Sequence, residues 1–579
     1  MPKSITVDVE TDGLDKFRDK LVTIAYRFDD QGPVEVIEFD KGERGSKEFI
    51  LALGDPSIIK RGHNVTFDIL FLENNGYSVN GPLDDTKVLA YLADPFADHG
   101  LKALVEHTLG KVPTKLKDIK KRKGRKLEKV SEIDRAALIA YNKEDVVNTG
   151  DIRKLQYPSK WYIEVEQPLI NIVRDMEKRG IQLDIPKLRE LDDELTEKIQ
   201  QIEKEFTFNP KSPKQVSEHY EKEVDIRDYT RKTKSGQWQV NKLALKKLVW
   251  DGYEPATRLL KYRELSKLKT TYTVPLLSGT DNDGRIHGSF NQAGSSEDTG
   301  GTATGRLTSS GPNLQNIPDR TKEGKRIREC FIATIEPGVI WTLGDADLKQ
   351  IEPRLVAHYS QSEKLLDAYN NGLDTHALMA SSIFDKDVSS LSKIERFVGK
   401  TSWLATVYGS YPKKLKQICE IYADEKLEYP EDFYEEVRDN FWKANPEIER
   451  WRNQHIEATR RVGYITTLGG RRIVIPNINS KSFFDRNEAE RLAVNYLIQG
   501  SASDIMKIGL VKLQQVVDYM DLGNSFKILA TIHDEILYEF LIKPEEALEL
   551  VGDAMTYSVK LDNVPLEVDN KIVNNWSEK

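Results

Sequence analysis

The sequence places carboxylates at the ends of two strand-like segments that lie far apart in its second half. The first segment is the apolar run Val339–Leu343, which we expect to be a buried strand that ends at Asp345 and Asp347. The second is a predicted tight hairpin with Asp534 at its tip, since apolar residues alternate on both sides of it. Asp is common at hairpin tips for turn geometry alone, but two such carboxylates, brought together, could hold a pair of divalent metal ions. The chain is therefore expected to form a sheet in which these two segments meet.

A third pattern places two cations on one face of a predicted helix. Arg396, Lys400, Leu404 and Tyr408 recur every four residues, so their side chains would form one stripe. A basic stripe is most often only a solvated helix face. Beside two metal-binding carboxylates, however, the same stripe could grip a triphosphate, and the three patterns together favour phosphoryl-transfer chemistry.

The length of 579 residues exceeds what one hydrophobic core can organise and favours roughly three or four compact domains. No apolar run approaches the roughly 18 residues of a membrane span, so we expect no membrane contact. The N-terminus lacks a signal-peptide pattern, and we expect the mature chain to start there. Only two cysteines, Cys330 and Cys419, are present, which fits a reducing, cytoplasmic compartment and excludes a cysteine-based zinc cluster.

The formal net charge of −8 argues only weakly against a nucleic-acid partner, because binding needs a local positive surface and not a positive total. The stretch Lys111–Lys129 holds ten Lys or Arg residues against two acids, Asp118 and Glu128. Such a run can be a solvated loop or a phosphate contact, and the sequence leaves both interpretations open.

Four acids and a tyrosine in the first 155 residues could share one site. Asp8 and Glu10 are two apart in an alternating apolar strand, so both side chains leave the same face. Asp68 opens an apolar helical stretch, and Tyr141 and Asp145 lie four apart on one helical face. Taken alone, the first pair could belong to a polar edge strand and the last to an exposed helix. Four carboxylates that meet would raise one another's pKa, so a site with divalent metal ions is implied.

These segments resemble the three motifs of the 3′-5′ proofreading exonucleases that use four acids and a tyrosine. The resemblance implies a ribonuclease H-like exonuclease domain over residues 1–155. It also implies that two metal ions are held by Asp8, Glu10, Asp68 and Asp145, one to generate hydroxide and one to stabilise the leaving 3′ oxygen. Tyr141 would position the attacking water and would not bind metal.

The remainder of the chain resembles the family A DNA polymerases of bacteria and phages. Thr304–Ser309 and Pro312–Pro318 are similar to a primer-template contact segment, and Ile163–Leu183 and Tyr262–Tyr272 are similar to segments that flank the thumb. The implied fold is therefore multi-domain α/β and α+β, with a right-hand polymerase after the exonuclease. The expected boundaries are connector and thumb at 156–300, palm at 301–360 and 456–579, and fingers at 361–455.

The resemblance assigns the carboxylates of the second half. Asp347 and Asp534 would share two Mg²⁺ or Mn²⁺ ions, Leu348 is counted with the metal ligands, and Glu535 would be an outer or occasional ligand. Asp345 would then be only a neighbour of the site. The lysine-rich, helical stretch between residues 164 and 277 carries no catalytic signal and is expected to grip duplex backbone.

The resemblance also assigns the contacts to a deoxynucleoside triphosphate. Arg396 and Lys400 would bind its β and γ phosphates, Tyr408 would lie on the template side, and Leu404 stands where the family mostly has an aromatic residue. Glu352 would block a ribose 2′ hydroxyl, which favours deoxynucleotides. Gln350 and His376 are also counted with the nucleotide-binding residues. A lone histidine, however, more often forms hydrogen bonds with its own neighbours than takes part in catalysis.

Contacts to primer-template DNA are assigned in the same way. Arg306 would touch the minor-groove edge near the primer end, and His533 would lie near the primer terminus. Minor-groove acceptors occur in every base pair, which suits a sequence-independent enzyme. The helix residues that would read them are Arg491, Asn495 and Gln499, and the residues expected to contact the DNA backbone are Asn313, Gln315 and Asn316.

These observations predict a template-directed DNA polymerase with proofreading, without a separate 5′ nuclease domain and of a phage replicative type, in the host cytoplasm. Expected partners are primer-template DNA and replication factors such as a helicase or a single-strand-binding protein. Three alternatives stay open: a single-subunit RNA polymerase, which Glu352 opposes; an exonuclease whose second half only clamps DNA; and a non-catalytic scaffold.

Overall fold

The protein is described by a computed structural model that covers residues 2–122, 125–294, 302–319, 321–423 and 425–578, apart from the side chains of residues 121, 122, 125 and 126. The predicted domain boundary at residues 300 and 301 lies outside the described residues, as does the centre of the basic stretch Lys111–Lys129. None of the helices in the described ranges combines the length and the apolar character that a membrane crossing requires.

The first 155 residues fold around a five-stranded sheet with the order β3-β2-β1-β4-β5. Its central strand, β1 (Ser4–Thr11), pairs antiparallel with β2 (Leu21–Phe28) and parallel with β4 (Ile59–Gly62). Nearly every residue of β1 is buried, because the helices α2 and α6 pack against the sheet. The other elements of this unit are β3 (Glu35–Ile37), η1 (Phe39–Lys41), α1 (Lys47–Gly54), α2 (Val65–Asn74), β5 (Leu83–Asp85), α3 (Thr86–Ala93), α4 (Leu101–Leu104), η2 (Val105–Leu109), α5 (Leu116–Ile119), β6 (Lys121–Arg122), β7 (Arg125–Lys126), η3 (Val130–Glu132) and α6 (Arg135–Leu155).

The helix α7 (Gln167–Arg179) joins this unit to the rest of the chain and follows the short helix η4 (Tyr162–Glu166). It packs on one side against α2 and β5, and on the other against α21 (Phe483–Tyr519) and β18 (Phe526–Ile532) of the second half. Ile170 of α7 belongs to the hydrophobic core of the first unit, whereas Leu169 and Val173 belong to the core of the second. The two parts therefore share one buried helix.

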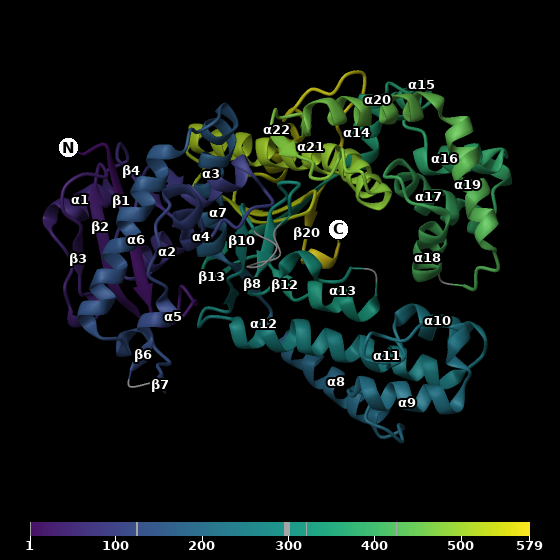
Figure 1. Ribbon diagram of the computed structural model, residues 1–579, viewed down its shortest axis with the longest axis horizontal. Coiled ribbons are helices and arrows are strands. Elements are labelled where there is room, and N and C mark those ends of the chain that lie inside the picture. The colour runs from purple at the N-terminus through teal and green to yellow at the C-terminus, as the bar shows by residue number, and fades with distance from the viewer. Residues whose placement is uncertain (1, 123–124, 295–301, 320, 424, 579) are drawn as a thin grey trace.

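Long helices project below the body of the molecule in Figure 1. In α8 (Ile185–Glu203), the residues Leu188, Leu191, Leu195 and Ile199 are buried, which is the spacing of one helical face. The Asp184 side chain caps this helix by accepting the backbone N–H of Lys187. The neighbouring elements are β8 (Ile181–Leu183), α9 (Pro213–Glu223), η5 (Ile226–Asp228), α10 (Lys242–Trp250), α11 (Glu254–Leu268), η6 (Lys269–Thr273) and α12 (Val274–Gly279).

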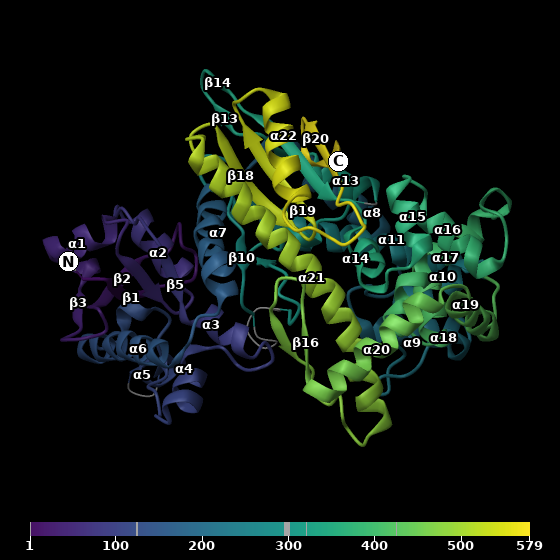
Figure 2. The ribbon, with the colours of Figure 1, turned by 90° about the horizontal axis from the view of Figure 1, so that it is seen from above.

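A four-stranded antiparallel sheet with the order β18-β19-β15-β20 occupies the centre of the second half. Its strands are β15 (Thr342–Leu348), β18 (Phe526–Ile532), β19 (Glu535–Phe540) and β20 (Val568–Val573). Figure 2 shows the long helix α21 (Phe483–Tyr519) and α22 (Pro544–Thr556) running beside these strands. The sheet brings residues near 345 and 535 into register, as the sequence analysis requires.

The structure corrects the prediction of one buried strand at Val339–Leu343. Val339 and Ile340 form β14 (Val339–Ile340), which pairs with β13 (Ile335–Glu336) in a short hairpin, and Ile340 is 88% exposed. The buried strand β15 starts later and continues through Asp347 to Leu348, so both acids lie within a strand and not beyond its exit. The chain turns at Gly338, whose φ of 78° suits a tight turn.

The helices from α14 to α20 lie at the right of Figure 1, where the fingers were predicted. α17 (Lys393–Val407) begins with a capping box between Ser392 and Glu395 and buries Val398, Trp403 and Val407. The others are α14 (Ile351–Ser360), α15 (Glu363–Asn370), α16 (Thr375–Phe384), η8 (Val388–Ser390), α18 (Pro412–Tyr422), α19 (Glu431–Ala444) and α20 (Pro446–Val462). The remaining elements of the chain are β9 (Arg285–Ile286), β10 (Ser289–Asn291), β11 (Thr308–Ser310), η7 (Leu314–Asn316), α13 (Lys322–Arg328), β12 (Phe331–Ile332), β16 (Tyr464–Thr466), β17 (Arg472–Val474) and η9 (Trp576–Glu578).

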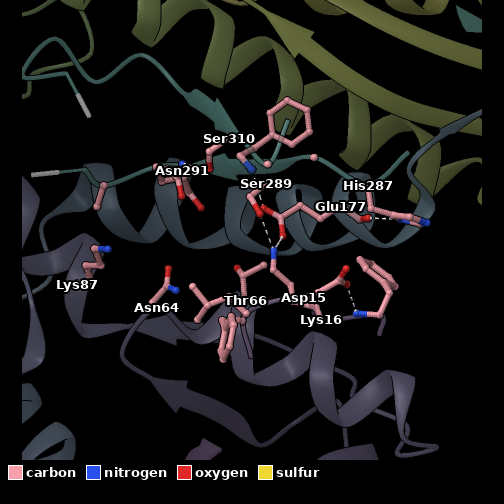
Figure 3. Close-up of a pocket in the computed structure, with 18 of the residues that line it drawn as sticks. Asp15, Lys16, Asn64, Thr66, Lys87, Glu177, His287, Ser289, Asn291 and Ser310 are labelled. Atoms are coloured by element: carbon pink, nitrogen blue, oxygen red, sulfur yellow. Dashed lines mark hydrogen bonds and ion pairs between the residues drawn. The ribbon is translucent and has the colours of Figure 1, made fainter. Parts of the chain in front are cut away.

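The loop between β1 and β2 reaches from the first unit to the second across a cavity of about 510 Å³. Figure 3 shows Lys16 directed at Glu177 of α7 and at Ser289, with which it forms an ion pair and a 2.9 Å hydrogen bond. The ring of Phe17 stacks on His287 at a centroid distance of 4.0 Å. These contacts add to the shared helix in fixing the first unit against the second.

Candidate active sites

The acids predicted in the first unit meet beside β1. One carboxylate oxygen from each of Asp8, Glu10 and Asp145 lies within 4.8 Å of the others. Asp68 accepts a backbone N–H of β1 at 3.0 Å, and its charge raises the pKa of Glu10. Tyr141 on α6 is a hydrogen-bond partner of Asp145. The structure thus brings together all five residues that the sequence analysis proposed here.

The electrostatics of this acid cluster call for cations. Burial, followed by repulsion between the acids, raises the pKa of Asp8, Glu10 and Asp68 well above its usual value, and burial raises that of Asp145. Carboxylates in such a group stay ionised at neutral pH only where positive charge compensates them. Because every donor is a carboxylate oxygen, the set suits hard divalent ions such as Mg²⁺ or Mn²⁺.

Two residues of this site were missed by the sequence analysis. Lys102 on α4 forms an ion pair with Asp145, and its Nζ lies 4.1 Å from the centroid of the Tyr141 ring. Asn142 donates from Nδ2 to Asp8 Oδ2 at 2.6 Å and holds that carboxylate in place. No local pattern marks Lys102, because α4 has only four residues and its partner lies on a distant helix. The position of Asn142 next to Tyr141 on a predicted helix was a usable signal.

The two acids of the second half also converge. Asp347 pairs in register with Glu535, and the backbone N–H of Leu348 donates to the carbonyl oxygen of Asp534 at 3.0 Å. Burial raises the pKa of Asp534 to about 6, and the nearby charge of Asp347 adds to that rise. His533 has a φ of 57°, which the two-residue turn of this hairpin requires. The predicted hairpin, with its acid at the tip, is therefore present.

Glu535 lies opposite Asp347 and is 1% exposed. Its Oε1 accepts the indole N–H of Trp576, near the end of the chain. This bond orients the carboxylate that the sequence analysis proposed as an outer ligand.

An arginine enters this second site from the loop before β11. Arg306 Nη2 donates to Glu352 Oε1 at 2.6 Å and lies 3.8 Å from Asp534 Oδ1. The hydroxyl of Tyr408 donates to the other oxygen of Glu352 at 2.5 Å. Glu352 therefore links the end of α17 to Arg306, and Arg306 links both to the acid at the hairpin tip.

The predicted cationic stripe lies on α17, with one correction. Tyr408 is not part of the helix, which ends at Val407; it is the C-cap residue, and its backbone N–H donates to Leu404. Arg396 forms an ion pair with Asp374, and Lys400 is exposed. Leu404 is partly buried against the hydrophobic core.

His376 and Gln350 lie beside this stripe and beside α14. The imidazole of His376 accepts the indole N–H of Trp403 at 3.4 Å, and burial and the charge of Lys400 lower its pKa. Gln350 has a φ of 50° at the N-cap of α14, and its Oε1 accepts a hydrogen bond from Thr375 at 2.6 Å. His376 therefore joins α16 to α17, and Gln350 joins the start of α14 to α16.

The predicted DNA-reading residues divide into two groups. Arg491, Asn495 and Gln499 are partly exposed on α21, and Arg491 lies against Gly409, next to Tyr408. In the loop at residues 313–316, by contrast, Gln315 donates its amide N–H groups to the carbonyl oxygens of Leu307 at 3.0 Å and Thr531 at 3.3 Å. Asn313 accepts a backbone N–H of this loop, and Asn316 accepts the hydroxyl of Tyr272 through its carbonyl. These hydrogen bonds hold the loop in its conformation and fix it to Leu307, Thr531 and Tyr272.

Comparison with protein families identifies two matching regions. Residues 2–155 match the family described as 3′-5′ exonuclease, and residues 185–578 match DNA polymerase family A. The second match covers more than half of the chain. Both agree with the expected fold class, an exonuclease domain followed by a polymerase domain of mixed α/β structure.

Curated relatives give the same result. The chain is 34% identical to DNA polymerase I of Chloroflexus aurantiacus over 90% of its own length and 55% of the relative's length. It is 31% identical to DNA polymerase I of Borreliella burgdorferi over 100% and 62%, and 37% identical to the thermostable DNA polymerase I of Thermus filiformis over 72% and 48%. The chain thus spans about half to three fifths of the length of these relatives.

A solved structure is similar over the whole chain. It is described as the POL domain of Pol1 from M. smegmatis in complex with DNA primer-template and dNTP, and its TM-score to this chain is 0.80. The two chains are 28% identical, and the similarity covers 100% of this chain and 96% of the other.

Proposed function

The chain belongs to DNA polymerase family A and carries a 3′-5′ exonuclease domain, and on that premise we propose that it extends a primer 3′ end along a DNA template and removes mispaired nucleotides from the same end. The observation that carries the proposal is the convergence of Asp347 and Asp534 on adjacent strands beside Arg306, while a separate acid cluster forms around Asp8. Two sites with different donor sets fit two phosphoryl-transfer reactions on one strand.

Two Mg²⁺ or Mn²⁺ ions per site are the proposed cofactors. In the polymerase site, Asp347 and Asp534 would hold them, with the backbone of Leu348 and the Glu535 carboxylate beside them. In the exonuclease site, the ligands would be Asp8, Glu10, Asp68 and Asp145. Ions bound there would activate the attacking oxygen and stabilise the leaving group.

The proposed substrates are deoxynucleoside triphosphates, and the proposed partner is primer-template DNA. Support comes from the similar structure, whose title names both ligands. Arg396 and Lys400 would attract the phosphates, since both are exposed cations four residues apart on α17. His376 and Gln350 would line the nucleotide site beside them. Arg306 and Tyr408 hold the Glu352 carboxylate by hydrogen bonds. There it would exclude the 2′ hydroxyl of a ribonucleotide and so favour deoxynucleotides.

The DNA would run along α21, where Arg491, Asn495 and Gln499 form a partly exposed stripe that leads to Tyr408. Tyr141, beside Asp145, would orient the attacking water in the exonuclease site. A replication helicase or single-strand-binding protein as partner, a cytoplasmic location and a phage source stay predictions of the sequence; the relatives named above are bacterial.

A primer-extension assay tests this proposal. A labelled primer on a defined template is incubated with Mg²⁺, with and without deoxynucleotides. Extension with nucleotides and shortening without them is the expected result. Shortening without any incorporation would instead support an exonuclease whose second half only clamps DNA.

A further inference from the structure

The loop that carries Arg306 into the polymerase site is held from two sides by buried polar groups. This loop, residues 302–306, lies just before β11, and Arg306 at its end contacts Glu352 and Asp534. Its backbone carbonyl oxygens at Thr302 and Thr304 each accept a hydrogen bond from a side chain distant in the sequence. The position of Arg306 therefore depends on residues that do not touch the site.

The first of these residues is Arg471, whose side chain is 4% exposed. Its Nη2 donates to Thr304 O at 2.8 Å, and its Nε donates to Asp504 Oδ1 at 2.6 Å. Gly305 has a φ of 86°, and a Cβ at this position would come within 2.4 Å of the Arg471 guanidinium. The loop thus lies so close to Arg471 that residue 305 has no room for a side chain.

The second residue, Tyr91, comes from the exonuclease domain. It lies on α3, is 2% exposed, and donates its hydroxyl to Thr302 O at 2.7 Å. The backbone N–H of Gly305 donates to the same Thr302 carbonyl oxygen at 3.5 Å, so Tyr91 binds the loop where its turn closes. The Tyr91 ring packs in a hydrophobic cluster with Tyr162 and Ala293, which hold it in place.

We propose that Tyr91 and Arg471 are positioning residues for Arg306, and that the exonuclease domain thereby supports the polymerase site. The proposal rests on the proposed function, because it concerns how Arg306 acts in strand extension. A buried carbonyl without its donor costs free energy, so the loop has a reason to stay where these two donors are. A displacement of about 1 Å is enough to weaken a group that must be held in reactive geometry.

The test is the substitution Tyr91→Phe, which removes one hydroxyl and keeps the ring in its cluster. We expect extension of a correctly paired primer to fall about 3- to 10-fold, as loss of one buried hydrogen bond predicts. The exonuclease rate on single-stranded DNA should not change, because the Tyr91 hydroxyl binds the loop of Arg306 and is not one of the groups that form the acid cluster. Tyr162→Phe is the matched control. It removes a buried hydroxyl from the same cluster, but that hydroxyl binds Asp84 and the backbone of Asp85 instead of the loop.

A double-mutant cycle separates positioning from a general loss of stability. Extension is measured for Arg306→Ala, for Tyr91→Phe and for the two combined, with melting temperatures recorded for each. If Tyr91 acts through Arg306, then Tyr91→Phe has little further effect once Arg306 is removed. An equal fold-change in both backgrounds overturns the proposal, and so does a Tyr91→Phe enzyme that extends as fast as the unaltered protein. Failure of the unaltered protein to extend any primer would contradict the proposed function instead.

Discussion

The acid clusters of the two domains solve the same electrostatic problem in different ways. In the exonuclease site, the carboxylates of Asp8, Glu10, Asp68 and Asp145 come from one domain, and the partly exposed Lys102 forms an ion pair with Asp145. In the polymerase site, Asp347, Asp534, Glu352 and Glu535 come from elements far apart in the chain, and Arg306 pairs with Glu352 and lies 3.8 Å from Asp534. Burial raises the pKa of Asp8, Glu10 and Asp68 well above its usual value, whereas it raises that of Asp534 to about 6. Metal ions should therefore matter more to the folding of the exonuclease site than to that of the polymerase site.

If the two sites work independently, removal of the acids of one site should abolish only one activity, and this is the largest effect that we expect. Asp534→Ala should lower extension by roughly 10³-fold or more and leave primer degradation intact, since groups that act as a catalytic unit fail together. Asp8→Ala combined with Glu10→Ala should do the reverse. Gel assays of both activities on one primer-template measure this, and loss of both activities from either change would refute the two-site model.

Lys102 tests how positive charge stabilises the exonuclease site. Without metal, Lys102→Met should lower the stability of the exonuclease domain by about 1–3 kcal/mol, because it removes the cation paired with a buried acid. Added Mg²⁺ should recover most of the lost melting temperature. Lys143→Met, an exposed lysine on the same helix as Asp145, is the control and should have no effect. A Lys102→Met protein that melts normally without metal would show that the ammonium group does not stabilise the cluster.

Leu404 concerns only the polymerase site. Leu404→Phe places an aromatic face beside the proposed nucleotide. It should change the ratio of 2′,3′-dideoxynucleotide to deoxynucleotide incorporation by a factor that corresponds to at most about 3 kcal/mol. Exonuclease activity should not change. Competitive incorporation on one template gives the ratio directly. Identical ratios in the two proteins would exclude a role for this position in nucleotide selection.

The smallest expected effect is a difference in pH dependence. Asp534 has a pKa of about 6, so its ionised fraction, and with it metal affinity, should fall only about twofold between pH 7 and pH 6. In the metal-free protein, the raised pKa of Asp534 adds to the free energy of unfolding. This contribution is fully present below a pH of about 3.8 and is lost as the pH rises through about 6. Burial raises the pKa of the exonuclease acids Asp8 and Glu10 well above its usual value. As the pH is lowered, the Mg²⁺ requirement of the exonuclease activity should therefore rise at a higher pH than that of the polymerase activity. Equal Mg²⁺ requirements for both activities from pH 6 to pH 8 would contradict this order.

The parts of the fold that sequence could predict are those set by local spacing. The hairpin around His533 and Asp534 and the helix with Lys400 follow from alternation and from a four-residue period, and both are present. The apolar run Val339–Leu343 does not form one strand, because Pro337 and Gly338 make a turn just before it and Val339 and Ile340 pair with β13.

The missed residues have a different cause. Lys102 and Arg471 act on groups that only the tertiary fold brings near them, and neither lies in a pattern with its partner. A cation that pairs inside the fold cannot be distinguished in the sequence from the many exposed lysines and arginines of this chain. Residue roles that depend on such contacts become visible only in the folded structure.

The helix α7 constrains how a mispaired end would reach the exonuclease site under the proposed function. Because α7 contributes to the hydrophobic cores of both units, a hinge between them would have to break two cores at once. The two sites would then stay at one distance, which a DNA strand would have to cover by unpairing and sliding. The number of nucleotides that would fray before excision would be set by this architecture and would not depend on the base pair that failed.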